Sequence, residues 1–322
     1  MIISASRRTD IPAFYSEWFM NRIRDGYLIS RNPINRKPSK IILTPDVVDC
    51  IVFWTKNPIP MIPRLDELKD YMYYFQFTIT PYGRDIEKNI PDKRSVIIPA
   101  FQELSDKIGP DRIIWRYDPI FISDKYNVEY HMEAFTEIAE KLKGYTKKCV
   151  FSYIDNYAWI NNAMRNQGAR EIGTKEMQDI AVWVRDIAKA NGMSVATCSE
   201  RIDLGSLGID HNACIDKDLI ERLTGGKVKN LKKYLEHDGQ RDDCRCMISK
   251  EAGARNTCKN GCIYCYANDS SESLEKNISR YDPDAVCLCD VISPDEKVTD
   301  SPDMKSLIER DNQMTIFDIK IK

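Results

Sequence analysis

Short β-rich runs alternate with helical segments over the first 198 residues of this 322-residue chain, and this alternation constrains the fold more than any other feature. Helical periodicity is clearest at 128–145 and 174–192, where apolar residues recur every three or four positions. Repeated strand–helix alternation predicts a parallel sheet joined by right-handed crossovers. The predicted strands are residues 2–6, 50–54, 74–80, 112–117, 149–154 and 194–198.

Composition excludes several classes of protein. Hydrophobic residues make up 43% of the chain, enough to bury a full core, and 47 basic side chains balance 49 acidic ones. A protein that binds duplex nucleic acid or a membrane surface should carry a basic face, so we expect neither partner. The amino terminus lacks the apolar segment of a secretory signal, and no stretch reaches the roughly 20 apolar residues of a membrane span. We therefore expect a cytoplasmic protein.

Each predicted strand is followed by an unusually polar segment. Turn formation explains the Pro, Asn and Gly residues there, but not Lys56, Arg116, Asp118 and Glu200. A solvated loop or a local ion pair would explain any one of them. Because the carboxyl ends of parallel strands meet at one edge of a sheet, we expect a functional site at that edge. The segments are 6–12, 55–58, 78–83, 116–120, 154–157 and 198–200.

The cysteines divide the chain into two parts. Nine of the 11 lie beyond residue 197, so we separate a strand–helix part, residues 1–198, from a cysteine-rich extension, residues 199–322. In a reducing compartment, metal ligation or catalysis explains so many thiols better than a disulfide framework does. Cys50 and Cys149 lie in predicted strands, and we expect them to be ordinary buried thiols.

Three cysteines of the extension stand close together, at Cys258, Cys262 and Cys265, with the spacing C-x3-C-x2-C. Three thiolates can hold a [4Fe–4S] cluster and leave one iron open, whereas structural zinc takes four ligands. Gly261 gives the loop freedom to curl. The spacing favours the cluster. A zinc knuckle with a fourth ligand from elsewhere is the alternative.

Four further cysteines form a second candidate set: Cys198, Cys214, Cys244 and Cys246. Four ligands suit a closed structural zinc site or an auxiliary iron–sulfur cluster, and the sequence does not choose between them. The C-x-C pair lies eleven residues before the triplet, where it could fix the late loop against the sheet. The alternatives are unrelated buried thiols, or a site in which a second C-x-C pair at 287–289 replaces one pair.

The motif C-x3-C-x-aromatic-C is the cluster signature of radical S-adenosylmethionine (SAM) enzymes, and the chain resembles them. In most of that superfamily the motif follows the first strand, whereas here it comes after six predicted strands. The sequences SASRRTDIPAF, FWTKNP, RYDPI and CIYCYA resemble a smaller branch, which includes bacterial queuine lyases. The resemblance covers essentially residues 1 to 270. It implies a six-stranded (β/α) partial TIM-type barrel with a C-terminal cluster-binding extension.

The same resemblance implies the chemistry. A [4Fe–4S] cluster and SAM would supply a 5′-deoxyadenosyl radical, with electrons from a flavodoxin or ferredoxin. The substrate would be queuine, a 7-deazaguanine base, and C–N cleavage would release 7-aminomethyl-7-deazaguanine. One rival is a radical SAM lyase or repair enzyme for another nucleobase or nucleic acid. The other is a zinc-stabilised barrel that binds a partner without catalysis.

Matching the motifs assigns candidate roles to individual residues. Lys56 and Arg116 would meet the SAM carboxylate or ribose, Thr78 and Thr80 would line the same wall, and the backbone of Tyr264 would meet the adenine. A local pairing of the two cations with neighbouring aspartates is the alternative.

The substrate residues follow from the chemistry of a flat base with a guanine-like edge. A carboxylate can accept two hydrogen bonds from that edge, and Asp155 or Glu200 would supply it. Asp10 and Asp118 are the candidate catalytic carboxylates at the diol of the cyclopentene ring. It is equally open that these carboxylates only neutralise nearby arginines. The remaining substrate candidates are Arg7, Trp54 and Tyr157.

Overall fold

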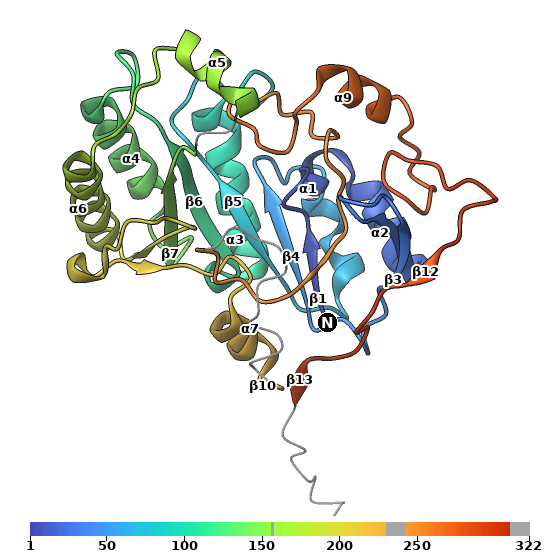
Figure 1. Ribbon diagram of the computed structural model, residues 1–322. Coiled ribbons are helices and arrows are strands. Elements are labelled where there is room, and N and C mark those ends of the chain that lie inside the picture. Colours follow the sequence, from blue (N-terminus) through green and yellow to red (C-terminus); the bar gives the residue numbers. More distant parts are fainter. Residues whose placement is uncertain (156–157, 230–242, 310–322) are drawn as a thin grey trace, which may run out of the picture.

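The computed structural model describes residues 1–155, 158–229 and 243–309. Its centre is an eight-stranded sheet in which every neighbouring pair is parallel (Figure 1). Each predicted strand corresponds to a strand of this sheet, so the predicted α/β class is confirmed. In spatial order the strands are β11 (Lys250–Glu251), β1 (Ile2–Ala5), β4 (Cys50–Thr55), β5 (Tyr73–Thr78), β6 (Ile113–Ile120), β7 (Lys148–Tyr153), β8 (Ser194–Thr197) and β9 (Asp210–His211).

The six long strands follow one another in chain order across the sheet. Each right-handed crossover therefore leads to the next strand in the same direction and places its helix on the same face of the sheet. Figure 1 shows α3, α4 and α6 together on one side of the strands. Trp18, Phe101, Phe135 and Val184 of the helices share a core with the strand residue Trp115. The helices of this face are α2 (Ser16–Asp25), α3 (Ile98–Ile108), α4 (Val128–Leu142) and α6 (Thr174–Ala190).

The second face of the sheet is covered by residues from beyond position 198. Side chains alternate across a strand, so Val52, Tyr74 and Ile114 point away from the first core. They pack in a second core with Ile220 of α7 (Lys217–Thr224) and with Ile308. Ile308 lies in a small antiparallel sheet formed by β10 (Lys227–Val228) and β13 (Ile308–Glu309).

Strands β9 and β11, at the two ends of the sheet order, also come from beyond residue 198. Each has only two residues, and they pair with β8 and β1. No pairing between β9 and β11 is found in the part of the chain that the structure describes. The sheet is thus a large parallel sheet that residues of the extension lengthen at both edges.

The remaining elements surround this sheet. An antiparallel hairpin of β2 (Tyr27–Arg31) and β3 (Pro38–Ile42), which the sequence patterns did not predict, is extended by β12 (Thr299–Asp300). Figure 1 shows α1 (Ile11–Phe14), α5 (Ala158–Asn166) and α9 (Ser271–Ile278) toward the carboxyl ends of the parallel strands.

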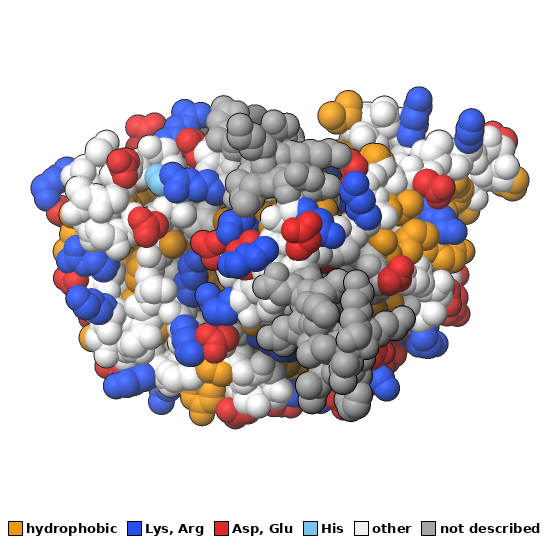
Figure 2. Space-filling view, turned by 90° about the horizontal axis from the view of Figure 1, so that it is seen from below, with side chains coloured by type: hydrophobic (Ala, Val, Ile, Leu, Met, Phe, Trp, Pro, Cys, Tyr) orange, Lys and Arg blue, Asp and Glu red, His pale blue; other side chains and the backbone are white. Residues whose placement is uncertain are grey.

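The surface is polar and mixed in charge. Seen from the amino ends of the strands, Lys and Arg side chains are interspersed with Asp and Glu (Figure 2). This agrees with a formal net charge of −2. Over the residues that the structure describes, no helix is both long enough and apolar enough to cross a lipid bilayer.

Candidate functional site

The loop that carries Cys258, Cys262 and Cys265 is fixed to the region just after β1. The Tyr15 hydroxyl donates a hydrogen bond to the Thr257 carbonyl oxygen at 2.6 Å. The Asn260 side-chain amide donates to Asp10 Oδ2 at 3.0 Å. A loop from the last fifth of the chain therefore lies against the carboxyl end of the first strand, the edge at which the sequence predicts a site.

The other side of this loop is fixed to the segment that follows β5. The backbone amide of Asn89 donates to the Asn260 carbonyl oxygen at 3.1 Å, and its side chain donates to the Lys259 carbonyl oxygen at 2.7 Å. Gly261 has a φ of +68°, a left-handed conformation that favours glycine. A Cβ atom there would lie 3.0 Å from Asn89 Nδ2, a crowded contact that glycine avoids.

The three thiols of the loop influence one another. Cys258 is buried, and Cys262 and Cys265 are half-buried. Burial raises the pKa of the Cys258 thiol, and the neighbouring Cys265 raises it further. Burial also raises the pKa of Cys262, while the nearby Lys56 ammonium lowers it. Three thiols therefore lie in poorly hydrated surroundings near a cation, where burial disfavours isolated thiolates.

A buried ion cluster adjoins Cys262. Lys56, which follows β4, lies with its Nζ 2.7 Å from Glu87 Oε1 and 2.9 Å from the Tyr264 hydroxyl. Tyr264 donates to the same carboxylate, and Lys93 pairs with it from the other side. Burial alone would raise the pKa of Glu87, but Lys56 and Lys93 lower it to about 2. Glu87 is thus an ionised carboxylate at the centre of the cluster.

The sequence analysis missed Glu87 and Lys93. Neither residue belongs to the polar segment directly after a strand, and their partners are distant in sequence, so no local pattern marks them. Glu87 lies four residues beyond the polar run TITPYG, in a turn that is closed by hydrogen bonds to the Gly83 carbonyl oxygen. An isolated bridge between Glu87 and Cys262 brings this turn against the cysteine loop.

Asp10 contacts the backbone of Lys56, a member of this ion cluster. It caps α1 by accepting a hydrogen bond from the Ala13 amide at 3.1 Å, and it accepts another from the Lys56 amide at 2.8 Å. Burial raises its pKa, while these bonds and the one from Asn260 lower it. The carboxylate therefore connects α1, the end of β4 and the cysteine loop, and these contacts hold the three segments in place.

The four cysteines of the second set converge, although they come from distant parts of the sequence. Cys198 Sγ and Cys214 Sγ lie 3.4 Å apart. Cys246 hydrogen-bonds to both Cys214 and Cys244. The contact with Cys246 lowers the pKa of Cys244 to about 6. In the described part of the chain, no three His, Cys, Asp or Glu side chains already stand in the arrangement of a metal's ligands.

Arg116 belongs to this second set of cysteines. Its Nη1 donates to Cys214 Sγ at 2.8 Å, and its Nε donates to Asp118 Oδ1 at 3.1 Å. Of the two interpretations that the sequence left open for Arg116 and Asp118, the contacts are those of the local ion pair. The guanidinium of Arg116 is buried, and its other recorded partner is Gln76 Oε1 at 3.3 Å.

Arg7 and Trp54 lie together beside the second face of the sheet. The Arg7 guanidinium is 5.8 Å from the centre of the Trp54 ring, and its Nη2 donates to Ser249 Oγ at 2.9 Å. Tyr266, next to the last cysteine of the triplet, donates to the Arg7 carbonyl oxygen at 2.6 Å. The loop after β1 therefore contacts the segments around both groups of cysteines.

The other predicted residues have less specific surroundings. Thr80 accepts a hydrogen bond from Lys93 at 3.3 Å, while Thr78 pairs in register with Arg116. Glu200 accepts from the Tyr153 amide at 2.7 Å. Asp155 is exposed directly after β7. Tyr157 lies outside the described residues.

The second C-x-C pair is placed away from the four-cysteine set. Cys287 forms an isolated bridge with Ile29 of the hairpin, and Cys289 hydrogen-bonds with Tyr15. Both residues are buried. The pair at 244–246, and not the pair at 287–289, therefore meets Cys198 and Cys214.

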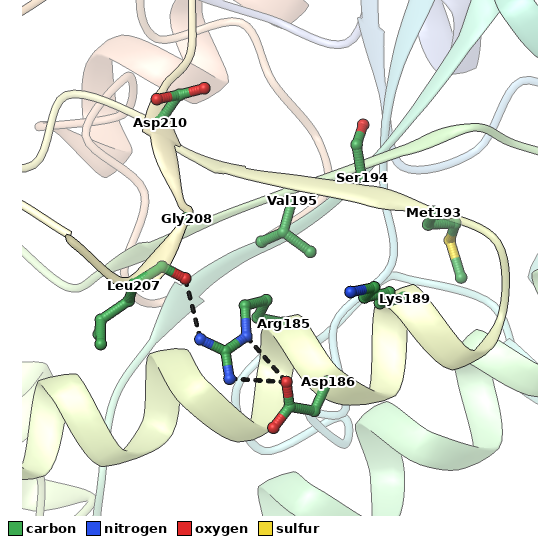
Figure 3. Close-up of a pocket in the computed structure, with 9 residues that line it drawn as sticks. All are labelled: Arg185, Asp186, Lys189, Met193, Ser194, Val195, Leu207, Gly208 and Asp210. Carbon is green, nitrogen blue, oxygen red and sulfur yellow. Dashed lines mark hydrogen bonds and ion pairs between the residues drawn. The ribbon is translucent and has the colours of Figure 1, made fainter. Parts of the chain in front are cut away.

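Two cavities open at the amino ends of the strands and contain none of the predicted site residues. The first, of about 500 Å³, lies between α6 and the start of β8. Figure 3 shows Arg185 bound there to Asp186 and to the Leu207 carbonyl oxygen. The second, of about 300 Å³, is lined by Asp49, Tyr73 and their neighbours. Neither cavity is lined by a cysteine, and Asp49, the buried carboxylate of the second one, pairs with the amino group of Met1.

These features define a parallel α/β protein with cysteines gathered at two places on its sheet. Residues 2–267 match the family described as a domain of unknown function (DUF1848), and the chain belongs to this family. The match includes both groups of cysteines and ends just after Cys265. No curated protein matches the chain.

Proposed function

We propose that this protein is a radical SAM enzyme whose cluster is bound by Cys258, Cys262 and Cys265. The observation that carries the proposal is the placement of these three thiols, in one short loop fixed at the carboxyl edge of a parallel sheet. Three cysteines leave one iron of a [4Fe–4S] cluster open for SAM. The reduced cluster with SAM bound would supply a 5′-deoxyadenosyl radical for hydrogen abstraction.

The surroundings of the triplet fit such a cluster. Thiolates in a buried volume need compensating positive charge, and Lys56 lies close enough to lower the pKa of Cys262. We assign the SAM carboxylate or ribose to Lys56, with Thr78, Thr80 and the Tyr264 backbone beside it. Arg116 is an equal candidate from the sequence, but it contacts Cys214 of the four-cysteine set, whereas Lys56 and its partner Glu87 adjoin Cys262, so we place Arg116 outside the SAM site.

The order of the strands also supports a barrel-type enzyme. Six parallel strands in chain order, with their helices on one face, are the arrangement expected of a partial (β/α) barrel. On the opposite face, the carboxyl halves of the strands carry Trp54, Gln76 and Arg116, while the amino halves carry the apolar residues of the second core. A polar inner face at the carboxyl ends is where such enzymes bind substrate.

The specific reaction that we propose is C–N cleavage of queuine, with release of 7-aminomethyl-7-deazaguanine. Trp54, held by Arg7, offers a flat surface for the base, and Tyr157 is a further candidate. Asp155 or Glu200 would accept hydrogen bonds from the guanine-like edge. Asp118 would meet the cyclopentene diol, and Asp10 would act by holding the cysteine loop. A flavodoxin or ferredoxin would donate the electron.

The test is an assay of the reconstituted, reduced protein under anaerobic conditions with SAM, with and without queuine. We expect 5′-deoxyadenosine and 7-aminomethyl-7-deazaguanine to form together, and only when queuine is present. Equal 5′-deoxyadenosine formation with and without queuine, without a cleaved base, would assign the enzyme to another substrate. If no 5′-deoxyadenosine forms with any nucleobase or nucleic acid offered, the radical SAM proposal is wrong.

A further inference from the structure

The four-cysteine set is assembled from three separate places in the chain. Cys198 follows β8, Cys214 follows β9, and Cys244 and Cys246 precede β11. Cys198 Sγ lies 3.4 Å from Cys214 Sγ, and Cys246 contacts both Cys214 and Cys244. Unrelated buried thiols have no reason to meet, because each could be satisfied by apolar packing alone. The four thiols instead form a continuous series of contacts, from Cys198 through Cys214 and Cys246 to Cys244, and this series needs an explanation.

The backbone around the set is held firmly in place. The Tyr74 hydroxyl and the Gln76 amide, both from β5, donate to the Cys214 carbonyl oxygen at 2.6 and 3.0 Å. The Ile215 amide donates to Cys246 Sγ at 3.4 Å. Contacts of this kind fix the orientation of sulfur ligands in metal sites. Two of the four cysteines are thus held by hydrogen bonds that involve neither a helix nor a strand ladder.

Positive charge also faces the set. Arg116 donates to Cys214 Sγ at 2.8 Å, and Arg7 lies within electrostatic range of Cys214 and Cys246. Four thiolates around a divalent cation carry a net charge of −2, and Arg7 and Arg116 lie where they would offset part of it. Glu251 and Asp118 already pair with these two arginines, so the arginines alone would not neutralise the site.

We propose that Cys198, Cys214, Cys244 and Cys246 bind one zinc ion. The separation of Cys198 and Cys214 favours zinc over a four-iron cluster. With a Zn–S distance of about 2.3 Å, the edge of the sulfur tetrahedron is roughly 3.8 Å. The 3.4 Å between Cys198 and Cys214 is close to this edge. In a four-iron cluster each cysteine binds a different iron, which sets the sulfurs farther apart.

Binding would require the four cysteine side chains to turn toward one another. The thiols now donate hydrogen bonds to one another, and their rotation about single bonds would turn the sulfurs toward a common centre. The ion would replace the thiol protons. It would join the β8–β9 edge of the sheet to the segment that leads into β11 at the opposite edge. Zinc here would thus stabilise the packing of the residues beyond position 198 on the second face of the sheet. This inference does not depend on the radical SAM proposal.

The experiment is metal analysis of purified protein whose triplet has been replaced by C258A/C262A/C265A, so that iron bound there does not interfere. We expect about one zinc per chain, as a closed four-cysteine site requires. In the same background, C244A/C246A should reduce zinc at least tenfold. The matched control is C287A/C289A, which removes the other C-x-C pair and should leave the zinc in place.

Cobalt substitution provides a second measurement that does not rely on a variant that folds poorly. The triplet variant, unfolded, stripped of metal and refolded with Co²⁺, should show the thiolate-to-cobalt charge-transfer absorption of a four-sulfur tetrahedral site. Iron near four or near two per chain in the triplet variant would overturn zinc in favour of an auxiliary cluster, and iron near one would overturn it in favour of a single-iron site. Absence of any bound metal, or zinc that C244A/C246A does not remove, would also overturn the proposal.

Discussion

The two groups of cysteines are built in opposite ways. The triplet occupies eight consecutive positions, and the rest of the protein holds that loop from outside through Asp10, Tyr15 and Asn89. The four-cysteine set has almost no local sequence order, and its members meet only because β5, β8, β9 and β11 belong to one sheet. A compact motif can thus be recognised before the fold is known, whereas a dispersed one becomes visible only in three dimensions.

The charged residues around the two groups of cysteines also differ. Beside the triplet, the buried carboxylate Glu87 balances Lys56 and Lys93. Beside the four-cysteine set, the arginine Arg116 contacts a sulfur directly. We infer that the first site keeps an open ligand position for chemistry, while the second is closed and structural.

The largest expected effect is that of removing the triplet. C258A/C262A/C265A should abolish SAM cleavage, a loss of at least about a thousandfold, because the open iron has no other protein ligands. The melting temperature should change little, since the loop is held by backbone and side-chain contacts outside the thiols. Measured 5′-deoxyadenosine and circular dichroism check both parts. Retained cleavage activity would show that the compact motif is not the catalytic one.

The next largest effect should come from the ion cluster next to the triplet. Glu87→Gln leaves two buried lysines without their carboxylate, so we expect a loss of about 3–5 kcal/mol in the free energy of unfolding. The control is Glu137→Gln, whose carboxylate pairs with Arg94 on the surface at 2.6 Å. That change should cost at most about 1 kcal/mol. Urea unfolding measures both, and equal losses would contradict the central place of Glu87.

Lowering the pH should reduce the stability of the protein because it favours protonation of the buried His131. This ring is buried between the Tyr117 hydroxyl and the Phe121 carbonyl oxygen, at 2.9 and 3.0 Å, and its edge faces the Tyr82 ring. Burial lowers the pKa of His131 to about 4. The folded state therefore keeps the ring neutral, and its contribution to stability is complete above pH 6.5 and is lost as the pH falls toward 4.

The size of this effect follows from the shift in pKa. Between pH 7 and pH 4 the free energy of unfolding should fall by about 3 kcal/mol more in the wild type than in His131→Gln, which cannot titrate. The two proteins share every other acidic and basic group, so the difference isolates the histidine. Parallel pH profiles from urea unfolding would mean that the pKa of His131 is the same in the folded and the unfolded protein.

The smallest expected effect concerns the curl of the cysteine loop. Gly261→Ala places a Cβ at a φ of +68° and 3.0 Å from Asn89 Nδ2. We expect a cost of about 1–2 kcal/mol from the backbone alone, with a further contribution from the contact. Gly192→Ala, at a φ of +77° with nothing within 4 Å, is the matched control. If both variants lose the same stability, the crowding at the triplet has no energetic consequence.

Much of the fold could be predicted because its main strands and helices carry their own periodicity. The runs at 50–54 and 149–154 became β4 and β7 because a strand buried on both faces is a continuous apolar run. Strands β9 and β11 have two residues each, too few for any period. Their place is set by the sheet edge that they pair with, which no local pattern encodes.

The candidate site residues also divide into those that a local sequence pattern predicts and those that it does not. The triplet and its position at the strand ends could be expected from spacing and from the rule for parallel sheets. Glu87 and Lys93 could not, because their significance comes from Lys56 and Tyr264, which are distant in sequence. The contact of Arg116 with Cys214 could not be predicted either, because the two residues are 98 positions apart and meet only in the folded protein.

The central claim is that the triplet holds a cluster with an open iron, and electron paramagnetic resonance of the reduced protein tests it most directly. Freshly reconstituted protein, reduced with dithionite, should give the signal of one [4Fe–4S]⁺ cluster, and SAM should shift that signal because it binds the open iron. The C258A/C262A/C265A variant should give no such signal. A signal that SAM leaves unchanged, or one that persists in the variant, would contradict the account.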